Sequence, residues 1–290
     1  MEARISVRRG FLFPPYVFLL FPAVAFMLLM YAYPFLASVA RSLIDNQGNL
    51  SFANYAKTWD LYLKDVIFTF GVTIFSTLVT ALLSILLAVY LRFGNSPISR
   101  ILAGLYKLPI FIPFVVVAQM MRSFLAPHGL LNVALAKLGL ISIDYPLQLL
   151  NFSGLSFGFI WKMVPFTVLI VHGGFQMIDN SYIEAARSAG ATLFKVITRI
   201  LIPMSKSSIL VALVLVYSQI VGTFTLPYML IGGKIPTTIT VDIAHRVNYF
   251  RDFGVANTLG VFSYLLVLVT ALYYLRSTVK KIGETAPAEA

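Results

Sequence analysis

Apolar residues are grouped along this chain into six long runs, which are separated by shorter polar stretches. The runs cover residues 12–40, 66–91, 101–124, 153–177, 206–230 and 255–275. Since about 20 apolar residues in a helix cross the hydrocarbon layer of a bilayer, each run is long enough to span a membrane. Lipid offers the backbone amides no partner, so each span must be helical. The pattern predicts an all-α integral membrane protein, a bundle of about six transmembrane helices.

One polar stretch between the fourth and fifth runs has an unusual pattern. It reads "EAARSAGATLFKVITRILIP" (184–203) and keeps helical spacing although it carries Glu184, Arg187 and Lys195. A single glycine, Gly190, interrupts it. Because glycine lacks the Cβ atom that penalises positive φ, it allows a sharp turn. The stretch therefore predicts two short helices with a bend at Gly190.

The amino-acid composition supports the membrane assignment and excludes several kinds of functional site. Of the 290 residues, 59% are hydrophobic and 11% are charged, whereas soluble domains carry roughly 25% charged residues. The chain has no cysteine, which excludes disulfides, thiolate metal sites and thiol catalysis. Its histidines, His128, His172 and His245, are too scattered to predict a metal site.

No sequence feature supplies an energy source or a reaction centre. "GGKIPTT" (232–238) lacks the spacing of a phosphate-binding loop. Most acidic residues lie in predicted loops or at the ends of the predicted spans, so there is no chain of intramembrane carboxylates of the kind that proton-driven carriers use. We therefore expect no catalytic residue, no metal and no cofactor in this chain.

The distribution of basic residues predicts the orientation. The net charge is +11, and Lys and Arg gather on the cytoplasmic side of membrane proteins. Their positions favour a cytoplasmic N-terminus, which also places the C-terminus and the 184–203 stretch in the cytoplasm. The first apolar run is longer than the roughly 7–15 residues of a signal peptide, so we expect a retained span. No basic stripe with interleaved aromatic residues indicates nucleic-acid binding.

The polar stretch also resembles a known signature. It consists of Glu184-Ala185-Ala186, three residues, Gly190, nine residues, Ile200, one residue and Ile202-Pro203. This resembles the EAA signature, E-A-A-x3-G-x9-I-x-L-P, of the permease subunits of bacterial ABC importers. Isoleucine replaces leucine at Ile202, and Ala189 stands where many sugar permeases carry aspartate.

The resemblance extends over most of the chain. Residues 60–280 resemble the shared permease core, with similar segments in 63–93, 108–132, "WKMVPF" (161–166) and "GTFTLPYMLIGG" (222–233). Residues 1–59 would supply an additional first span and an external loop, and 281–290 a cytoplasmic tail.

The resemblance implies the role of the polar stretch and a set of partners. The stretch would belong to a cytoplasmic coupling loop, 180–204, whose coupling helix docks on ATPase subunits. The coupling residues would be Glu184, Ala185, Ala186, Gly190, Ile200 and Pro203. Its apolar face would come from Ile183, Ala186, Phe194, Ile197 and Leu201. The implied partners are a second permease subunit (similar or identical), two ATP-binding cassette subunits that bind ATP and Mg, an extracytoplasmic solute-binding protein and membrane lipid. The implied location is the bacterial cytoplasmic membrane.

Polar residues on the predicted spans are candidates for the solute pathway. They are Gln119, Lys162, His172, Gln219, Thr223 and Tyr228. Intramembrane charge is costly and usually functional, so Lys162 and Arg122 would either line the pathway or extend to the interface as snorkelling side chains. The uncharged residues would bind solute or hydrogen-bond between helices.

The solute class is inferred from charge. The predicted spans carry basic residues and lack acids, which favours a neutral or mildly anionic solute such as a sugar. Some segments instead resemble polyamine-type permeases, so that alternative stays open. An ion-coupled secondary carrier would need an internal repeat or buried carboxylates, and a membrane-anchored structural protein would need no docking signature.

Overall fold

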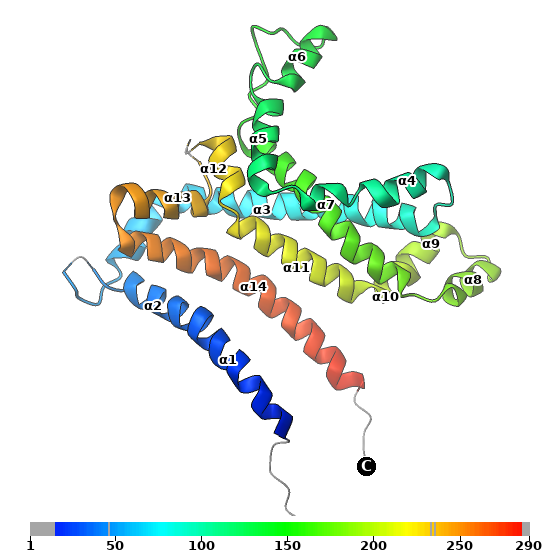
Figure 1. Cartoon of the computed structure of the whole chain (residues 1–290), viewed down its shortest axis with the longest axis horizontal. Helices are drawn as coiled ribbons and strands as arrows, with labels where there is room; N and C mark the ends of the chain where they lie inside the picture. The colour runs from blue at the N-terminus through cyan, green and yellow to red at the C-terminus, as the bar shows by residue number, and fades with distance from the viewer. Residues whose placement is uncertain (1–14, 46, 233, 235, 286–290) are drawn as a thin grey trace, which may run out of the picture.

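The computed structural model describes residues 15–45, 47–232, 234 and 236–285, and this part of the chain is predominantly helical (Figure 1). Its first half contains η1 (Pro15–Leu20), α1 (Phe21–Met27), η2 (Leu28–Ala32), α2 (Tyr33–Ser42), α3 (Ala53–Phe93), α4 (Pro97–Leu105), η3 (Leu108–Phe111), α5 (Phe114–Leu125) and α6 (Leu130–Lys137). The second half contains α7 (Phe152–Gln176), α8 (Asn180–Ser188), α9 (Leu193–Val196), η4 (Ile197–Leu201), α10 (Ile202–Met204), α11 (Lys206–Gly222), α12 (Thr225–Ile231), α13 (Ile239–His245), η5 (Arg246–Phe250) and α14 (Phe253–Thr285).

The helices that are long and apolar enough to cross a membrane confirm the predicted bundle of about six spans. Five of them are Phe18–Ser42, Ala53–Phe93, Phe114–Lys137, Phe152–Gln176 and Phe253–Tyr274. A sixth is counted if Leu193–Met204 and Lys206–Gly222, which are bent by 69° at Ser205, form one span. The domain boundary predicted between residues 59 and 60 falls inside α3.

The longest helix, α3, packs along α7 in the middle of the bundle (Figure 1). Its buried face is polar and small, whereas large apolar side chains on the same helix are exposed. The buried residues include Thr69, Thr73, Ser76, Thr80 and Ser84, and the exposed ones include Ile67, Phe70, Ile74, Leu78 and Leu82. Small buried side chains let helices approach closely in lipid, where a hydrophobic face gains nothing by turning inward.

Several hydroxyl groups of this buried face donate hydrogen bonds within the bundle, whereas those of Ser76 and Thr80 have no partner among the described residues. Thr69 Oγ1 donates to the Asp65 carbonyl and Thr73 Oγ1 to the Thr69 carbonyl, each at 2.7 Å. Ser84 Oγ donates to the Val164 carbonyl of α7 at 3.3 Å. These bonds make a polar face tolerable within a membrane protein.

Two of the predicted spans are interrupted. The third run, 101–124, is divided into α4, the 3-10 turn η3 and α5, because Pro109 and Pro113 lack the N–H that a continuous helix needs. In the fifth run, 206–230, the regular helix ends at Gly222, and Thr223 is extended (ψ 122°) before α12 begins.

The remaining four runs form helices that begin and end near the predicted bounds, with two exceptions. The helix α3 begins at Ala53, 13 residues before the predicted start at residue 66, and α14 continues to Thr285. Residues 12–14 and 286–290 lie outside the described residues.

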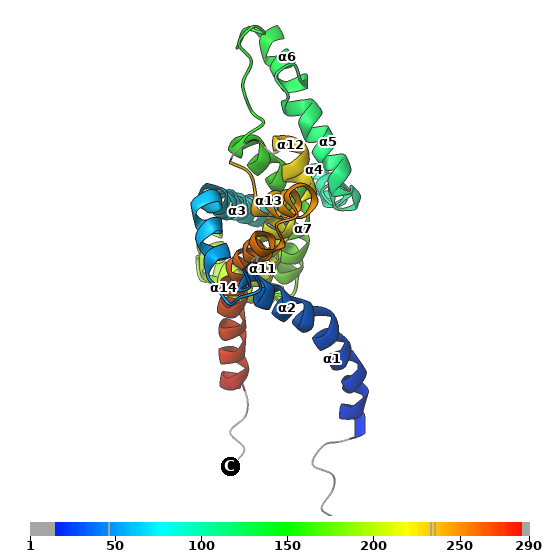
Figure 2. The ribbon, with the colours of Figure 1, turned by 90° about the vertical axis from the view of Figure 1, so that its left-hand side faces the viewer.

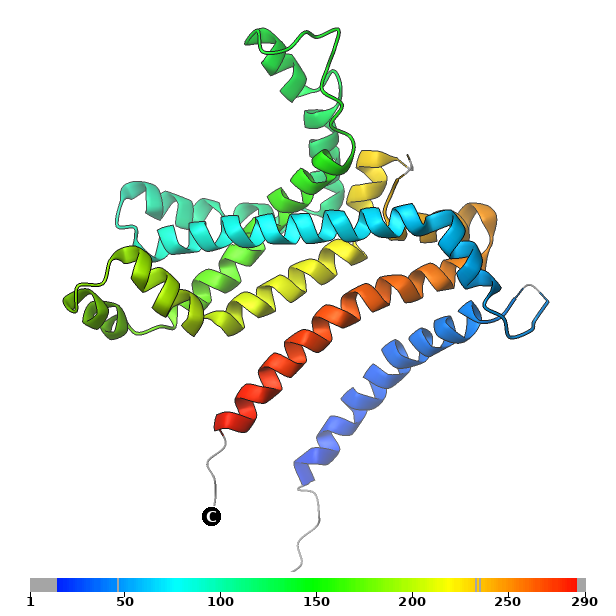
Figure 3. The same ribbon diagram turned by 180° about the vertical axis from the view of Figure 1, so that it is seen from behind.

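Three segments extend away from the central helices. The α5–α6 segment points to one side, and the α1–α2 helix and the end of α14 point to the other (Figure 2). Seen from behind, α2 runs beside the first half of α14 (Figure 3). There Ser38 Oγ donates to Asn257 Oδ1 at 2.7 Å, and the rings of Phe35 and Tyr264 are 4.0 Å apart.

Lys162 of α7 stabilises the break between α4 and α5. Its Nζ donates to the carbonyls of Pro109, Ile110 and Ile112 at 2.9, 3.1 and 2.6 Å. The same ammonium lies 5.4 Å from the ring centre of Phe114. Carbonyls at a helix break have no intrahelical donor, and lipid cannot supply one. Only 8% of Lys162 is exposed, so the expected alternative of a snorkelling lysine is wrong.

We predict that Lys162→Met lowers the thermal stability of the protein in detergent. The change removes a charged donor from three carbonyls, of which only that of Pro109 also accepts from a backbone N–H, at 3.3 Å from Ile112. Each buried polar group left unpaired costs about 1–3 kcal/mol. Amide hydrogen exchange should also increase in residues 107–113. The matched control is Lys137→Met, which alters an exposed lysine at the end of α6. Equal melting temperatures for the two variants would contradict the stabilising role.

Candidate functional site

The polar stretch forms two short helices at one end of the bundle, α8 and α9, each with a capped start (Figure 1). Asp179 caps α8 by accepting a hydrogen bond from the Ser181 N–H at 2.8 Å, and this bond, with one from the Ser181 side chain, lowers the pKa of Asp179. Thr192 caps α9, its Oγ1 accepting from the Lys195 N–H at 3.4 Å. A capping oxygen satisfies an N–H that has no partner inside the helix. Both helix starts are therefore fixed locally.

Gly190 forms the bend between the two helices, as its position in the sequence predicted. Its φ is +80°, and it closes α8 with two hydrogen bonds, Gly190 N–H to the Arg187 carbonyl and Ala191 N–H to the Ala186 carbonyl, both 2.9 Å. This is the Schellman arrangement, in which glycine takes the left-handed position after a helix. A Cβ atom at Gly190 would meet no atom within 4 Å. The backbone conformation alone requires glycine here.

Arg92, at the end of α3, binds the start of α8. Arg92 was not among the functional residues predicted from the sequence. Its Nη2 donates to the Ile178 carbonyl at 3.0 Å and to Asn180 Oδ1 at 2.5 Å. These contacts join the longest span to the first residues of the polar stretch. The sequence feature that could have indicated Arg92 is its place in the last turn of an apolar helix. A cation is favoured there because the last carbonyls of a helix have no partner within it.

The predicted apolar face is divided between buried and exposed positions, so that prediction is wrong. Ile183 and Leu201 are 7% and 0% exposed, and Leu201 packs with Ala88 and Phe175 inside the bundle. Phe194 is 74% exposed. The wide π-helical turn η4 (Ile197–Leu201) changes the helical phase after α9, so regular spacing does not hold across it. The exposed apolar surface near α8 is instead formed by Tyr182, Leu193 and Phe194.

The other signature residues occupy different parts of the stretch. Glu184 and Ala185 are exposed on α8, and within the described residues Glu184 has no hydrogen-bond or ion-pair partner. Ala186 is half-buried. Ile200 is half-buried in η4, and Pro203 is exposed in α10, just before the 69° bend into α11. The role of these residues in coupling remains a prediction.

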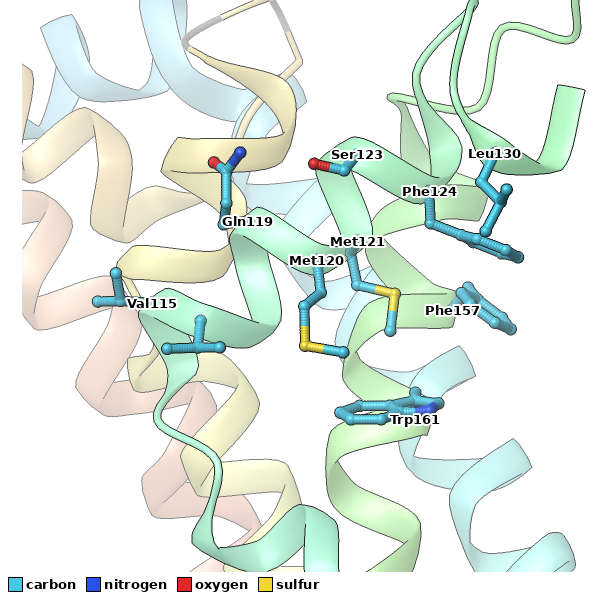
Figure 4. Close-up of a pocket in the computed structure, with 10 residues that line it drawn as sticks. Val115, Gln119, Met120, Met121, Ser123, Phe124, Leu130, Phe157 and Trp161 are labelled. Carbon is cyan, nitrogen blue, oxygen red and sulfur yellow. The ribbon is translucent and has the colours of Figure 1, made fainter. Parts of the chain in front are cut away.

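The pathway candidates do not converge on one cavity. Gln119 lines a mainly apolar groove of about 700 Å³ between α5 and α7. Figure 4 shows Gln119 and Ser123 on one side of α5, and Met120 and Met121 of the same helix pointing toward Trp161 of α7. Across the groove the rings of Phe124 and Phe157 stack with centres 6.3 Å apart. The groove offers a solute almost no polar partner.

Two smaller hollows hold three of the other candidates. Lys162 and Gln219 line one of about 280 Å³, beside Pro113 and Phe114. Tyr228 lines another of about 620 Å³, together with Arg122, Met229, Gly232, His245, Tyr249 and Phe250. Both Lys162 and Arg122 therefore border open space, although Lys162 also stabilises the backbone.

Thr223 and His172 line none of these three hollows. Thr223 Oγ1 donates to the Gln219 carbonyl at 2.5 Å, and the Thr223 carbonyl accepts from Thr240 Oγ1 at 3.0 Å. Thr223 thus stabilises the break between α11 and α12. His172 lies in the second half of α7, and its buried Nε2 has no partner in the described part of the chain.

Two carboxylates are buried in the bundle, and one of them, Asp65, lies inside the candidate span Ala53–Phe93 rather than at its end. Asp65 of α3 is 3% exposed and accepts a hydrogen bond from the Thr237 N–H at 2.7 Å. Asp242 of α13 is 5% exposed, and its Oδ2 has no partner among the described residues. Burial is the main cause that raises the pKa of Asp242, to about 8, and the negative charge of Asp65 contributes to the increase. The positive charge of Arg246 partly offsets it. Asp242 is therefore mostly uncharged at neutral pH.

Known proteins resemble this chain in both sequence and structure. Trehalose/maltose transport system permease protein MalF of Thermococcus litoralis is 28% identical over 185 residues, 61% of each chain. Spermidine/putrescine transport system permease protein PotB of Haemophilus influenzae is 28% identical over 178 residues, 60% of each chain. Sulfoquinovosyl glycerol transport system permease protein SmoG of Agrobacterium fabrum is 28% identical over 286 residues, 90% of this chain and 89% of that one.

Solved structures share the fold at lower identity. A chain of a bacterial ABC transporter involved in the import of the acidic polysaccharide alginate superposes with a TM-score of 0.76 at 22% identity, covering 91% of this chain and 94% of that one. A chain of an amino acid ABC transporter gives 0.55 at 17% identity, covering 80% and 99%. The model of one protein family matches residues 80–279, more than half of the sequence. The chain belongs to that family, the binding-protein-dependent transport system inner membrane components.

Proposed function

We propose that this chain is the transmembrane permease subunit of an ATP-driven ABC importer, which moves a small polar solute from a binding protein into the cytoplasm. The observation that carries the proposal is the capped α8–Gly190–α9 segment, held by Arg92 at one end of the spans, in a chain of this family. Relatives that are named as permease proteins of trehalose/maltose, sulfoquinovosyl glycerol and spermidine/putrescine transport systems support it.

The proposal includes the assembly. A second permease subunit, similar or identical, completes the pathway. Two ATP-binding cassette subunits bind ATP and Mg and hydrolyse the ATP, so this chain holds no cofactor of its own. An extracytoplasmic binding protein delivers the solute. The chain lies in the bacterial cytoplasmic membrane with both termini and α8 in the cytoplasm, which agrees with the predicted charge bias.

The α8 segment provides a physical route for coupling. Glu184 and Phe194 are exposed and available to a partner, whereas Ile183 is anchored in this chain. A displacement of α8 by a closing ATPase pulls on Arg92 and thus on α3, which packs along α7. Rigid helices transmit such a displacement across the membrane, and opening alternates between its two sides.

The solute class remains a sugar or related compound in this proposal, with a polyamine as the second candidate. The polyamine alternative is supported by the spermidine/putrescine relatives. The buried acids Asp65 and Asp242 are also the kind of group that an ion-coupled secondary carrier would use. Family membership argues against that third class.

The central test is co-purification followed by reconstitution. Tagged chain extracted from its native membrane should carry an ATP-binding cassette subunit with it. Proteoliposomes that contain the complex should import solute only with ATP and the binding protein present. Solute import that follows an ion gradient without ATP would contradict the proposal, as would the absence of any ATPase in the purified material.

We predict that Gly190→Val uncouples the importer. A branched residue at φ +80° costs about 1–3 kcal/mol of backbone strain, which is comparable to a typical coupling free energy of about 1–3 kcal/mol. Stimulation of ATP hydrolysis by loaded binding protein should fall at least tenfold. Gly139→Val is the matched control, because Gly139 has φ +72° and equally open space but follows α6. Equal stimulation in the two variants would show that strain at the α8 bend has no special effect.

We predict that Arg92→Gln weakens coupling through the α3–α8 contact. Glutamine cannot donate from the same distance to both the Ile178 carbonyl and Asn180 Oδ1, so α8 loses its link to the bundle. The ratio of stimulated to basal ATP hydrolysis should fall several-fold, and Arg92→Lys should restore part of it. Arg100→Gln, an exposed arginine on nearby α4, is the control. An unchanged ratio in Arg92→Gln would remove Arg92 from the coupling route.

A further inference from the structure

The hollow that contains Tyr228 lies at the opposite end of the bundle from α8, where α5, α12 and η5 meet (Figure 1). Its volume of about 620 Å³ falls in the range of small-molecule sites, roughly 300–1,000 Å³. The lining combines one guanidinium, one imidazole and several aromatic rings, and none of the lining residues carries a carboxylate. Its chemistry therefore differs from that of the apolar groove between α5 and α7.

Arg122 supplies the charge of this hollow. Its Nη1 donates to the Met229 carbonyl at 3.2 Å, which fixes the guanidinium against α12. A guanidinium has five N–H donors, and within the described residues Arg122 has no other hydrogen bond. The free donors form a planar group that matches the two oxygens of a carboxylate or sulfonate. The residue is exposed, so a solute can reach it.

Aromatic side chains form a continuous row beside this charge. Phe224 and Tyr228 stack with centres 4.9 Å apart, and Tyr228, His245 and Tyr249 follow edge to face at 6.4 and 5.7 Å. The hydroxyl and imidazole groups give the row polar tips, while the ring faces are apolar. A pyranose ring has the complementary form, with a C–H face that packs on aromatic rings and hydroxyl groups at its edge.

The surrounding charges disfavour a polyamine in this hollow. Arg246 lies against Phe250, with its guanidinium carbon 4.8 Å from the ring centre, and adds a second positive charge behind the lining. Asp252 is already paired with Lys57 at 2.6 Å and with Arg246 at 3.5 Å. Asp65 and Asp242 are buried outside the lining. A dication would meet like charge without a free carboxylate.

We propose that this hollow binds an anionic saccharide, with Arg122 on its acidic group and the row Tyr228–His245–Tyr249 along its sugar ring. The inference rests on the proposed function and narrows its solute class. Arg122 contacts the solute during transport and sets the preference for charged over neutral sugars. The acidic group can be a carboxylate or a sulfonate, since both present oxygens to the same donors.

The test uses the complete reconstituted importer with its binding protein. The probes are trigalacturonic acid, other acidic oligosaccharides that carry carboxylate, sulfonate or sulfate, the neutral counterpart of each, and spermidine. Wild-type importer should transport an acidic member better than its neutral counterpart. Arg122→Gln should raise the KM for the acidic member at least tenfold while changing that for the neutral counterpart less than twofold, and Arg122→Lys should be intermediate. Lys137→Gln, which removes an exposed charge outside the hollow, should resemble wild type.

The outcomes separate this inference from the proposed function. An assembled, ATP-dependent importer that transports only neutral sugars or spermidine would overturn the inference and leave the proposed function intact. An Arg122→Gln variant with the wild-type preference for acidic sugars would also overturn it. Failure of the chain to assemble with an ATPase would instead reject the proposed function.

Discussion

The need to satisfy every backbone polar group within lipid governs this structure. Regular helices meet that need internally, so the informative positions are those where a span is broken. At the break between α4 and α5, Lys162 donates to three carbonyls, and at the break between α11 and α12 the Thr223 carbonyl accepts from Thr240. The first break borders a hollow lined by Ile110, Ile112 and Lys162, and α12, which follows the second break, lines another hollow through Tyr228. Irregular backbone is thus found beside open space, where a transport protein needs polar groups.

The two ends of the bundle are specialised by different means. At the α8 end, a glycine with positive φ, two capped helix starts and the contacts of Arg92 make a short segment rigid. A rigid segment transmits displacement, whereas a flexible one absorbs it. At the opposite end, loops and short helices bring Arg122, Tyr228 and His245 together from three elements. The two proposed sites, one for a solute and one for a partner, therefore lie at opposite ends of the same core.

The acidic residues show how burial changes the meaning of a charge pattern. Asp65 and Asp242 would suggest a cationic solute if only their presence were counted. They are instead buried between α3, α13 and the segment before α13, where Asp65 accepts from the Thr237 N–H. Burial raises the pKa of Asp242 to about 8, with a further contribution from Asp65, so this carboxyl carries little charge at neutral pH. The positive charge of Arg122, in contrast, lies on an open surface.

The amino-acid sequence by itself determined the class of the protein, the approximate positions of its spans and the bend at Gly190. These features depend on local properties: the length of apolar runs, the absence of competing partners in lipid, and the φ range that glycine allows. Only the tertiary structure decided what Lys162, Arg92, Asp65 and Arg122 do, because their partners are separated from them by 50 to 172 positions along the chain. It also divided the expected apolar face of the coupling segment, since the wide turn at η4 breaks the regular spacing on which a helical pattern relies.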